Sequence, residues 1–503
     1  MVFNVSMRYL QLIFIAWIYC GVTFAQVDSL QLKTDSTLND TIKIPVGETP
    51  EVLNPSPGYN KYGDLLNDDP AYNKRYPVWI PALRVTTTNA FNWALARYFF
   101  NYDWARISTD TWKENLKHGF KWDDDRFGVN FIGHPHTGNY YFNVARSNGY
   151  NYIQSLPFVI GGSLMWEYFG ENVPPSRNDI INTPLSGSML GEMFYRITSN
   201  ILDDRKKGSQ RFLREALVAL INPTRSLNRL TQGKLSRVTP HEVYQKEPLN
   251  IILNTGIHKV NANNKFGTGS TNAIINMQLD YGDPFEVRKS KPMDHFRLRL
   301  ESRYGDDQKL IDNVIGYGLL AGTNISNDNY GMLIGAFQHF DYWNNKIFEL
   351  GSLGFGPGII TRIRLGNSVQ LYSSLHIAGV PLAGNSSRSA PDTSEFRDYP
   401  FGGGFEGRIE ETLNLSKWVS LGLTAYYYWI YHYEGIEGKS KIGIIKPRIS
   451  VKLFRNLHIG MEHQVYYDNR FIEDLPPLRT RQTEQKFYLQ FLFEDRRWKG
   501  QYH

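Results

Sequence analysis

The chain has 503 residues, of which 14% are aromatic, and carries a formal net charge of +6 with a mean hydropathy of −0.40. This polar composition argues against a bundle of membrane-spanning helices, each of which needs ~20 consecutive apolar residues. The modest charge is spread along the chain without a dense basic run, so a nucleic-acid partner is not expected.

Residues 1–25 are predicted to form a secretory signal peptide. Arg8 supplies the positive charge of the N-terminal region, and residues 10–16 form the apolar core. Small residues occupy the −3 and −1 positions of the predicted cleavage site before Gln26. The apolar run is short and no stop-transfer pattern follows, which favours cleavage over a membrane anchor. The only cysteine, Cys20, lies inside this leader, so the exported chain is expected to have no disulfide and no cysteine metal site.

Two segments with different patterns follow the leader. Residues 26–76 are rich in Asp, Thr, Ser, Asn and Pro and are predicted to be an extended or disordered periplasmic segment. Residues 77–240 are predicted to be a helical domain, because their apolar residues recur at helical spacing between turn signals. The expected helices are Asn89–Tyr102, Gly138–Asn148, Tyr150–Gly170, Thr183–Leu202 and Gln210–Ile221.

Local signals predict how these helices begin and pack. Thr183 followed by Pro184 predicts an N-cap and a first helical position. Gly187 and Gly191 have the spacing that lets two helices approach closely. The most apolar run, Ile153–Trp166, is too short to span a membrane. The helices are therefore expected to plug or cap the β-barrel that is predicted for residues 248–495, or to lie on the periplasmic leaflet of the membrane.

From Pro248 onward, apolar and polar residues alternate with a period of two, which is typical of strands. An even strand number and a high aromatic content are typical of bacterial outer-membrane barrels, whereas a soluble β-sandwich or barrel, the alternative, would expose one polar face to water. About twelve strands are expected, starting near Leu249, Thr271, Asp294, Asn313, Tyr330, Phe348, Ser368, Gly402, Trp418, Lys441, Leu457 and Gln485.

The predicted fold is therefore α+β. It is an antiparallel transmembrane β-barrel of about twelve strands at residues 248–495, preceded by a helical plug or cap domain and followed by a tail at residues 496–503. The predicted location is the outer membrane. Outer-membrane lipid and the barrel-assembly machinery are the expected partners, beside a small-molecule ligand whose nature is left open.

Polar residues are densest between Asp123 and Arg196. Ionisable groups held at membrane depth are candidate site residues, and His, Glu and Asp supply acid, base or ligand atoms while Arg binds anions. Glu167 and Glu171 are four apart and share a helix face. The predicted catalytic residues are His134, Glu167, Glu171 and Glu192, and the predicted ligand-binding residues are Arg146, Asp179 and Arg196.

No metal and no cofactor are expected at this constellation, because no recognised metal, nucleotide or hydrolase motif is present. The acidic triplet Asp123–Asp125 has no calcium ligand ladder after it and is interpreted as a solvated turn. An alternative interpretation of the whole group is a hydrogen-bonded scaffold that ties the helices together, since structural ion pairs have the same appearance in a sequence.

Several short motifs, in a fixed order along the chain, resemble those of a known protein family. They are Gly133-His134-Pro135, Ala145-Arg146-Ser147-Asn148-Gly149, Trp166-Glu167-Tyr168, Asn178-Asp179 and Gly191-Glu192. Here the chain resembles a family of uncharacterised exported Gram-negative proteins that is classed only as a domain of unknown function. The similarity covers about Asn89 to Lys234. It implies a cell-envelope protein and supplies no activity, so no catalytic role is carried over.

Three functions fit these observations. The first is binding or transport of an unknown ligand, with helices that gate the barrel lumen. The second is a lipid-modifying envelope enzyme that uses His134 with a carboxylate. The third is a structural barrel without a small-molecule role. For the first function, the groups expected to line the lumen are Arg297, Arg299, Glu301, Glu462 and Gln464.

Overall fold

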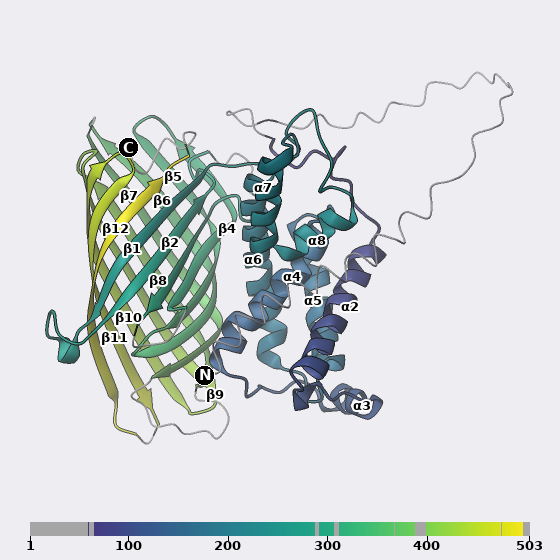
Figure 1. Cartoon of the computed structure of the whole chain (residues 1–503). Helices are drawn as coiled ribbons and strands as arrows, with labels where there is room; N and C mark the ends of the chain where they lie inside the picture. The colour runs from purple at the N-terminus through teal and green to yellow at the C-terminus, as the bar shows by residue number, and fades with distance from the viewer. Residues whose placement is uncertain are drawn as a thin grey trace, which may run out of the picture. The chain divides into compact units, whose positions relative to one another are not determined.

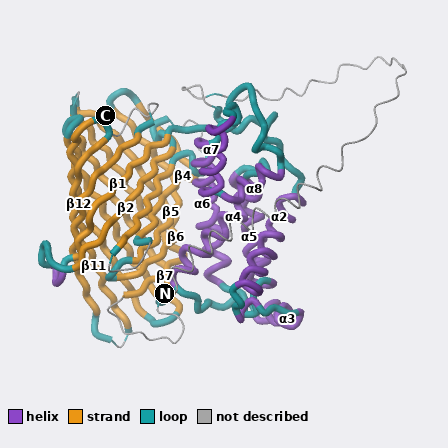
Figure 2. The backbone as a smooth tube through the Cα atoms, viewed as in Figure 1, coloured by secondary structure: helices purple, strands orange, loops and turns teal. Residues whose placement is uncertain are grey.

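The computed structural model describes residue 59 and residues 65–286, 291–305, 311–366, 368–387, 399–473 and 475–495. The predicted signal peptide, most of segment 26–76 and the tail 496–503 lie outside the described residues. The chain divides into two compact units, with residues 1–84, 143–155 and 194–246 in unit 1 and the remainder in unit 2. Figure 1 labels the elements, and Figure 2 colours them by type.

The second half of the chain, in unit 2, is a closed antiparallel barrel in which every strand pairs with its neighbours in sequence and β1 pairs with β12 (Figure 1). The twelve strands are β1 (Leu249–Val260), β2 (Ser270–Tyr281), β3 (Phe296–Tyr304), β4 (Asn313–Ser326), β5 (Tyr330–Asn344), β6 (Phe348–Leu365), β7 (Val369–Ser387), β8 (Phe401–Asn414), β9 (Val419–Glu434), β10 (Gly438–Phe454), β11 (Leu457–Ile472) and β12 (Leu478–Phe493). The predicted strand number and antiparallel barrel are confirmed.

The pairing of β1 with β12 closes the barrel, with Ile251 opposite Phe493 and Val260 opposite Glu484. Most predicted strand starts lie within three residues of the observed ones. The start of β12 differs more: it lies at Leu478 rather than near Gln485, because pairing with β11 from Arg470 onward holds a polar stretch in the sheet that has no apolar alternation of its own.

Side chains alternate between the two faces of the wall. On β9, Tyr427 and Tyr431 are half exposed on the outer face, whereas Tyr426 and Tyr428 are buried on the inner one. Apolar side chains thus cover much of the outer face, and charged and aromatic side chains fill the inside, as expected of a barrel in a lipid bilayer.

Helices occupy the part of the chain before β1. They are α2 (Trp79–Ala94), α3 (Thr109–His118), α4 (His134–Arg146), α5 (Tyr152–Phe169), α6 (Arg177–Ile201), α7 (Gly208–Ile221) and α8 (Pro223–Thr231), with short π and 3₁₀ turns between some of them. Among the described residues, none of these helices has both the length and the apolar character needed to cross a membrane.

The start predicted for α6 at Thr183 is wrong. The helix begins at Arg177, and Pro184 lies inside it. Ser176 precedes the helix, and its hydroxyl accepts a hydrogen bond from the backbone N–H of Asp179 at 3.2 Å, which satisfies one of the free donors of the first turn. Asn222 ends α7 and also caps α8, since its side chain accepts from the N–H of Arg225 at 3.0 Å.

The close helix approach predicted from Gly187 and Gly191 is confirmed. Within unit 2, a Cβ atom on Gly187 would lie 2.5 Å from the Cα of Gly138 on α4, and one on Gly191 would lie 2.7 Å from the ring of Phe142. Real Cβ atoms do not approach other heavy atoms this closely. Only glycine therefore lets α4 and α6 pack at this distance.

The polarity of α7, in unit 1, is the reverse of that of a helix in a water-soluble domain. Arg211 is 8% exposed, whereas Phe212 and Leu220 are 76% and 74% exposed. Charged groups thus share the interior of this part of unit 1 with a small apolar cluster that includes Val218, while large apolar side chains of α7 are exposed, as expected of a surface beside lipid.

Within unit 2, two helical residues contact the outer face of β5. The side-chain amide of Gln338 donates to the carbonyl of Leu185 at 2.8 Å, and the ring of Phe127 stacks on Tyr342 with centroids 5.3 Å apart. Gln338 and Tyr342 alternate along the strand with His339 and Asp341, which face the lumen. These contacts therefore lie on the outside of the wall.

Candidate functional site

A network of ion pairs crosses the barrel lumen. Arg299 on β3 donates to both carboxylate oxygens of Glu410 on β8, at 2.6 and 2.8 Å, and Arg297 donates to the same carboxylate at 2.5 Å. A second crossing pair joins Lys486 to Glu301 at 2.6 Å. Glu410 lies five strands from β3 around the barrel, so its ion pairs tie nearly opposite walls together, whereas Lys486 on β12 lies three strands from β3.

The residues predicted to line the lumen all face it. Arg297, Arg299 and Glu301 belong to the crossing pairs. Glu462 lies 3.6 Å from Lys486, and Gln464 donates to Glu462 and accepts from Tyr466. That part of the sequence-based prediction is confirmed.

Two apolar clusters fill much of the remaining lumen. Trp343, which is fully buried, packs edge-on against Tyr426 with ring centroids 5.6 Å apart. Tyr317 packs similarly against Phe337, with centroids 6.0 Å apart. The barrel is therefore filled by the side chains of its own strands.

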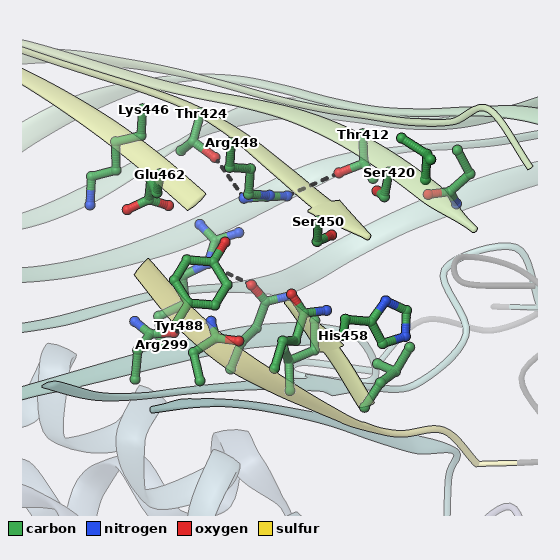
Figure 3. Close-up of a pocket in the computed structure, with 18 of the residues that line it drawn as sticks. Arg299, Thr412, Ser420, Thr424, Lys446, Arg448, Ser450, His458, Glu462 and Tyr488 are labelled. Carbon is green, nitrogen blue, oxygen red and sulfur yellow. Dashed lines mark hydrogen bonds between the residues drawn. The ribbon is translucent and has the colours of Figure 1, made fainter. Parts of the chain in front are cut away.

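A cavity of about 100 Å³ remains beside the ion-pair network (Figure 3). It lies near the turn between β8 and β9, since Lys417 and Trp418 are among its lining residues. Figure 3 shows the guanidinium group of Arg448 between the hydroxyls of Thr412 and Thr424, to which it donates at 3.0 and 3.3 Å.

Two cations of the cavity wall, Lys446 and Arg448, make no direct ion pair with a described residue, although Glu301 and Glu462 line the same cavity and Glu462 lies opposite Arg448 on β11. The ammonium of Lys446 lies 4.4 Å from the ring centre of Trp343, and Arg448 is held only by hydroxyl groups. Among the described residues, no carboxylate oxygen lies within ion-pair distance of either one. Neither residue was singled out from the sequence. The signal was present, because Lys446, Arg448 and Ser450 alternate with Ile445, Pro447 and Ile449 on β10.

A second candidate site lies in the helical part of unit 2. Nδ1 of His134, at the start of α4, is 3.6 Å from Oδ1 of Asp179 in the first turn of α6, and Nε2 is 3.8 Å from a carboxylate oxygen of Asp125. Glu167, near the end of α5, completes the group: ligand atoms of His134, Glu167 and Asp179 all lie within 4.8 Å of one another.

Hydrogen bonds from the cap of α6 hold these carboxylates in place. The N–H of Ser176 donates to Glu167 at 2.7 Å, and the amide of Asn178 donates to Asp179 at 3.1 Å. Asn178 and the hydroxyl of Ser176 also donate to Asp123, at 2.8 and 3.1 Å. The interpretation of the acidic triplet as a solvated turn is therefore wrong for Asp123, whose carboxylate organises this network.

Burial and mutual charge shift the pKa values of this cluster. Burial is the largest influence on His134 and lowers its pKa, but the charge of Asp179, the polar contact with Asp125 and the charge of Glu167 outweigh it and raise the pKa well above its ordinary value. Burial raises the pKa of Glu167 to about 7, against the opposing charge of His134. Burial likewise raises the pKa of Asp179. An imidazolium thus shares the site with Glu167 and Asp179, the pKa values of which are both raised by burial.

The structure brings together only some of the predicted site residues. His134, Glu167 and Asp179 converge. Glu171 accepts a hydrogen bond from the indole of Trp166 at 2.5 Å, and burial followed by the charge of Glu167 raises its pKa to about 8. The remaining three predicted residues are Glu192, which is buried further along α6, and Arg146 and Arg196, which belong to unit 1.

Comparisons with known proteins add a family match and weak structural similarities. The family model "Domain of unknown function (DUF3943)" matches residues 119–224, which contain the whole His134 cluster. None of the curated proteins matches the chain. Solved structures that are similar include the outer membrane channel DcaP of Acinetobacter baumannii, with 7% identity, a TM-score of 0.23 and coverage of 49% of this chain and 97% of that one.

Two further structures are similar at the same level. The anion-selective porin from Comamonas acidovorans has 8% identity, a TM-score of 0.23 and coverage of 49% of this chain and 99% of the porin. OmpT, an outer membrane protein of Vibrio cholerae, has 5% identity, a TM-score of 0.22 and coverage of 49% and 96%. Similarities of this strength carry no argument about function.

Proposed function

We propose that this chain is an outer-membrane barrel that binds a small anionic ligand, bearing a carboxylate or phosphate group, in its lumen and does not act as an open diffusion channel. The observation that carries the proposal is the pair of cavity cations, Lys446 and Arg448, neither of which has a carboxylate within ion-pair distance among the described residues, although Glu301 and Glu462 also line the cavity. Lys446 is buried and Arg448 is partly buried, and a cation withdrawn from water is costly unless an anion or hydrogen-bond acceptors compensate it.

The setting of Arg448 suits an anion. Its guanidinium is held by Thr412 and Thr424 through two hydrogen bonds, which leaves other N–H groups for a ligand. A planar guanidinium binds carboxylate or phosphate oxygens in pairs, and such charge-assisted hydrogen bonds are strong. The hydroxyl of Ser450 is placed beside it in Figure 3. The cavity volume, about 100 Å³, fits a small ligand rather than a polymer.

The surface of the described chain supports an outer-membrane location. Apolar side chains such as Leu423 and Phe487 are exposed on the outer face of the barrel, and Phe212 and Leu220 are exposed on α7. In this proposal the lumen is closed without a helix inside it. The ion pairs and the aromatic side chains of the strands occupy that space, and the helical contacts of Gln338 and Tyr342 are with the outer face of the wall.

Arg448→Ala is expected to weaken ligand binding at least about tenfold, because a hydrogen bond to a charged group is worth ~1.5–3 kcal/mol. The measurement is calorimetric titration of the purified full chain in detergent with inorganic phosphate and, separately, with acetate. The anion that binds more tightly shows whether the cavity recognises a phosphate or a carboxylate group. Arg448→Lys is expected to retain part of the affinity, since it keeps the charge and loses the fork of donors.

Arg479→Ala is the matched control, because Arg479 is exposed at the start of β12, and it is expected to bind as the wild type does. Equal affinity in the wild type and Arg448→Ala, or the absence of binding for both anions, would contradict the proposal.

A second candidate function, a lipid-modifying envelope enzyme, is favoured by the convergence of His134, Asp179 and Glu167. An imidazolium beside carboxyl groups with raised pKa values supplies both an acid and a base. Turnover of phospholipid vesicles by the purified chain, lost in His134→Ala and kept in Glu114→Gln, which changes an exposed glutamate of α3, would support this function. The absence of turnover in the wild type would remove it.

A further inference from the structure

The His134 cluster has too few positive groups for its acids. Among the described residues, His134 is the only basic side chain within ion-pair distance of Asp125 and Asp179, and none lies within that distance of Glu167. Glu167 and Asp179 are 3% and 2% exposed. Burying carboxylates in this way is unfavourable without further positive charge.

The distances between the donor atoms suit a shared cation better than direct hydrogen bonds. Nδ1 of His134 lies 3.6 Å from Oδ1 of Asp179, which is too long for a hydrogen bond. Two donors that each lie ~2.0–2.2 Å from one tetrahedral ion stand ~3.3–3.6 Å apart. The donor atoms of the group, at most 4.8 Å apart, reach that spacing through small side-chain rotations.

We propose that His134, Glu167 and Asp179 bind one divalent transition-metal ion. An imidazole nitrogen together with carboxylate oxygens is a donor set for Zn²⁺, Mn²⁺ or Fe²⁺, whereas Mg²⁺ and Ca²⁺ prefer oxygen alone. This inference goes beyond the lumen ligand, shares no residue with that site, and departs from the expectation of no metal drawn from the sequence.

The surroundings of the three residues resemble the outer shell of a metal site. With the ion on Nδ1 of His134, the Nε2 atom faces Asp125 at 3.8 Å, and such carboxylate–histidine pairs orient metal-bound imidazoles. Ser176 and Asn178 fix Glu167 and Asp179 by hydrogen bonds of 2.7 and 3.1 Å. Each carboxylate is thus oriented by a neighbouring donor, as metal-binding carboxylates are.

The test is the metal content of the purified full chain in detergent. The protein is stripped with a chelator, dialysed against low micromolar Zn²⁺ and analysed by mass spectrometry of the metal. About one Zn²⁺ per chain is expected in the wild type and at least a tenfold lower occupancy in Glu167→Gln and Asp179→Asn. Glu114→Gln, which changes an exposed glutamate of α3 outside the cluster, is expected to retain the ion.

A second readout does not depend on the variants folding. Co²⁺ substituted into the wild-type chain is expected to give the intense visible absorption of a low-symmetry site with nitrogen and oxygen ligands. An absent Co²⁺ spectrum together with no bound Zn²⁺ would overturn the inference, as would unchanged Zn²⁺ content in a folded Asp179→Asn variant. The metal proposal and the lumen proposal can fail independently of each other. Arg448→Ala is expected to keep its bound Zn²⁺, and Asp179→Asn is expected to keep its anion binding.

Discussion

Replacing Asp204 by alanine is expected to lower the opening free energy of the α7–α8 region by about 3–5 kcal/mol. Asp204 is 1% exposed and lies 3.0 Å from Arg211, 2.9 Å from Arg229 and 2.6 Å from Arg237. Its removal would leave these guanidinium groups with fewer carboxylates in the interior of unit 1. The measurement is hydrogen exchange of peptides from α7 and α8, whose protection is expected to fall about 100-fold or more.

Asp203→Ala is the matched control. Asp203 is adjacent in sequence and is also buried, but its ion-pair partner Arg205 is about half exposed, so the loss of opening free energy is expected to be smaller than that of Asp204→Ala. Equal effects of the two substitutions would contradict the claim that the buried network stabilises unit 1.

The same residue predicts the direction of a pH effect. Burial raises the pKa of Asp204, but Arg229, Arg237 and Arg211 outweigh it and the net shift is downward. The stability that this carboxylate contributes is therefore fully present above the pKa of an unfolded aspartate, about 3.9, and is lost as the pH falls through the lower folded value. The difference in opening free energy between the wild type and Asp204→Ala is expected to become smaller only at acidic pH.

Replacing Glu410 by alanine is expected to destabilise the barrel by about 3–5 kcal/mol, because Arg297 and Arg299, which lie on the same face of β3, would then lose their shared carboxylate. The measurement is the temperature at which the folded form is lost in detergent, followed by the shift in electrophoretic mobility between the folded and the unfolded chain.

Glu411→Ala provides the control one residue along β8. Because successive side chains of a strand point to opposite faces, Glu411 lies on the outer face, where it accepts a hydrogen bond from Ser373. Glu411→Ala is expected to change the temperature at which the folded form is lost only slightly. If Glu411→Ala destabilised the barrel as much as Glu410→Ala does, the ion-pair network could not be the cause.

The barrel could be predicted because its signal is local. A period of two assigns each residue of a strand to one face, so the sequence alone predicts that Arg297, Arg299 and Glu301 face the lumen, as they do. Their partners could not be predicted, since Arg299 and Glu410 are 111 residues apart and the alternation does not specify which walls face each other.

The helical site could be predicted only in part, for a related reason. His134, Glu167 and Asp179 were identified by residue type, but helical spacing shows which residues share a face and not which helix lies opposite. Glu192, Arg146 and Arg196 were grouped with them for that reason. The start of α6 was misplaced because Pro184 suggested a first turn, whereas Ser176 and Asp179 form the actual one.

The most direct test of the closed, ligand-binding lumen is the conductance of the purified full chain in planar lipid bilayers. The wild type is expected to insert without producing open-channel current, because ion pairs and Trp343 fill the lumen. The double variant Glu410→Ala/Trp343→Ala is expected to conduct, and Glu411→Ala is expected to remain silent. A steady wild-type current like that of an open pore, unchanged in the double variant, would contradict the account.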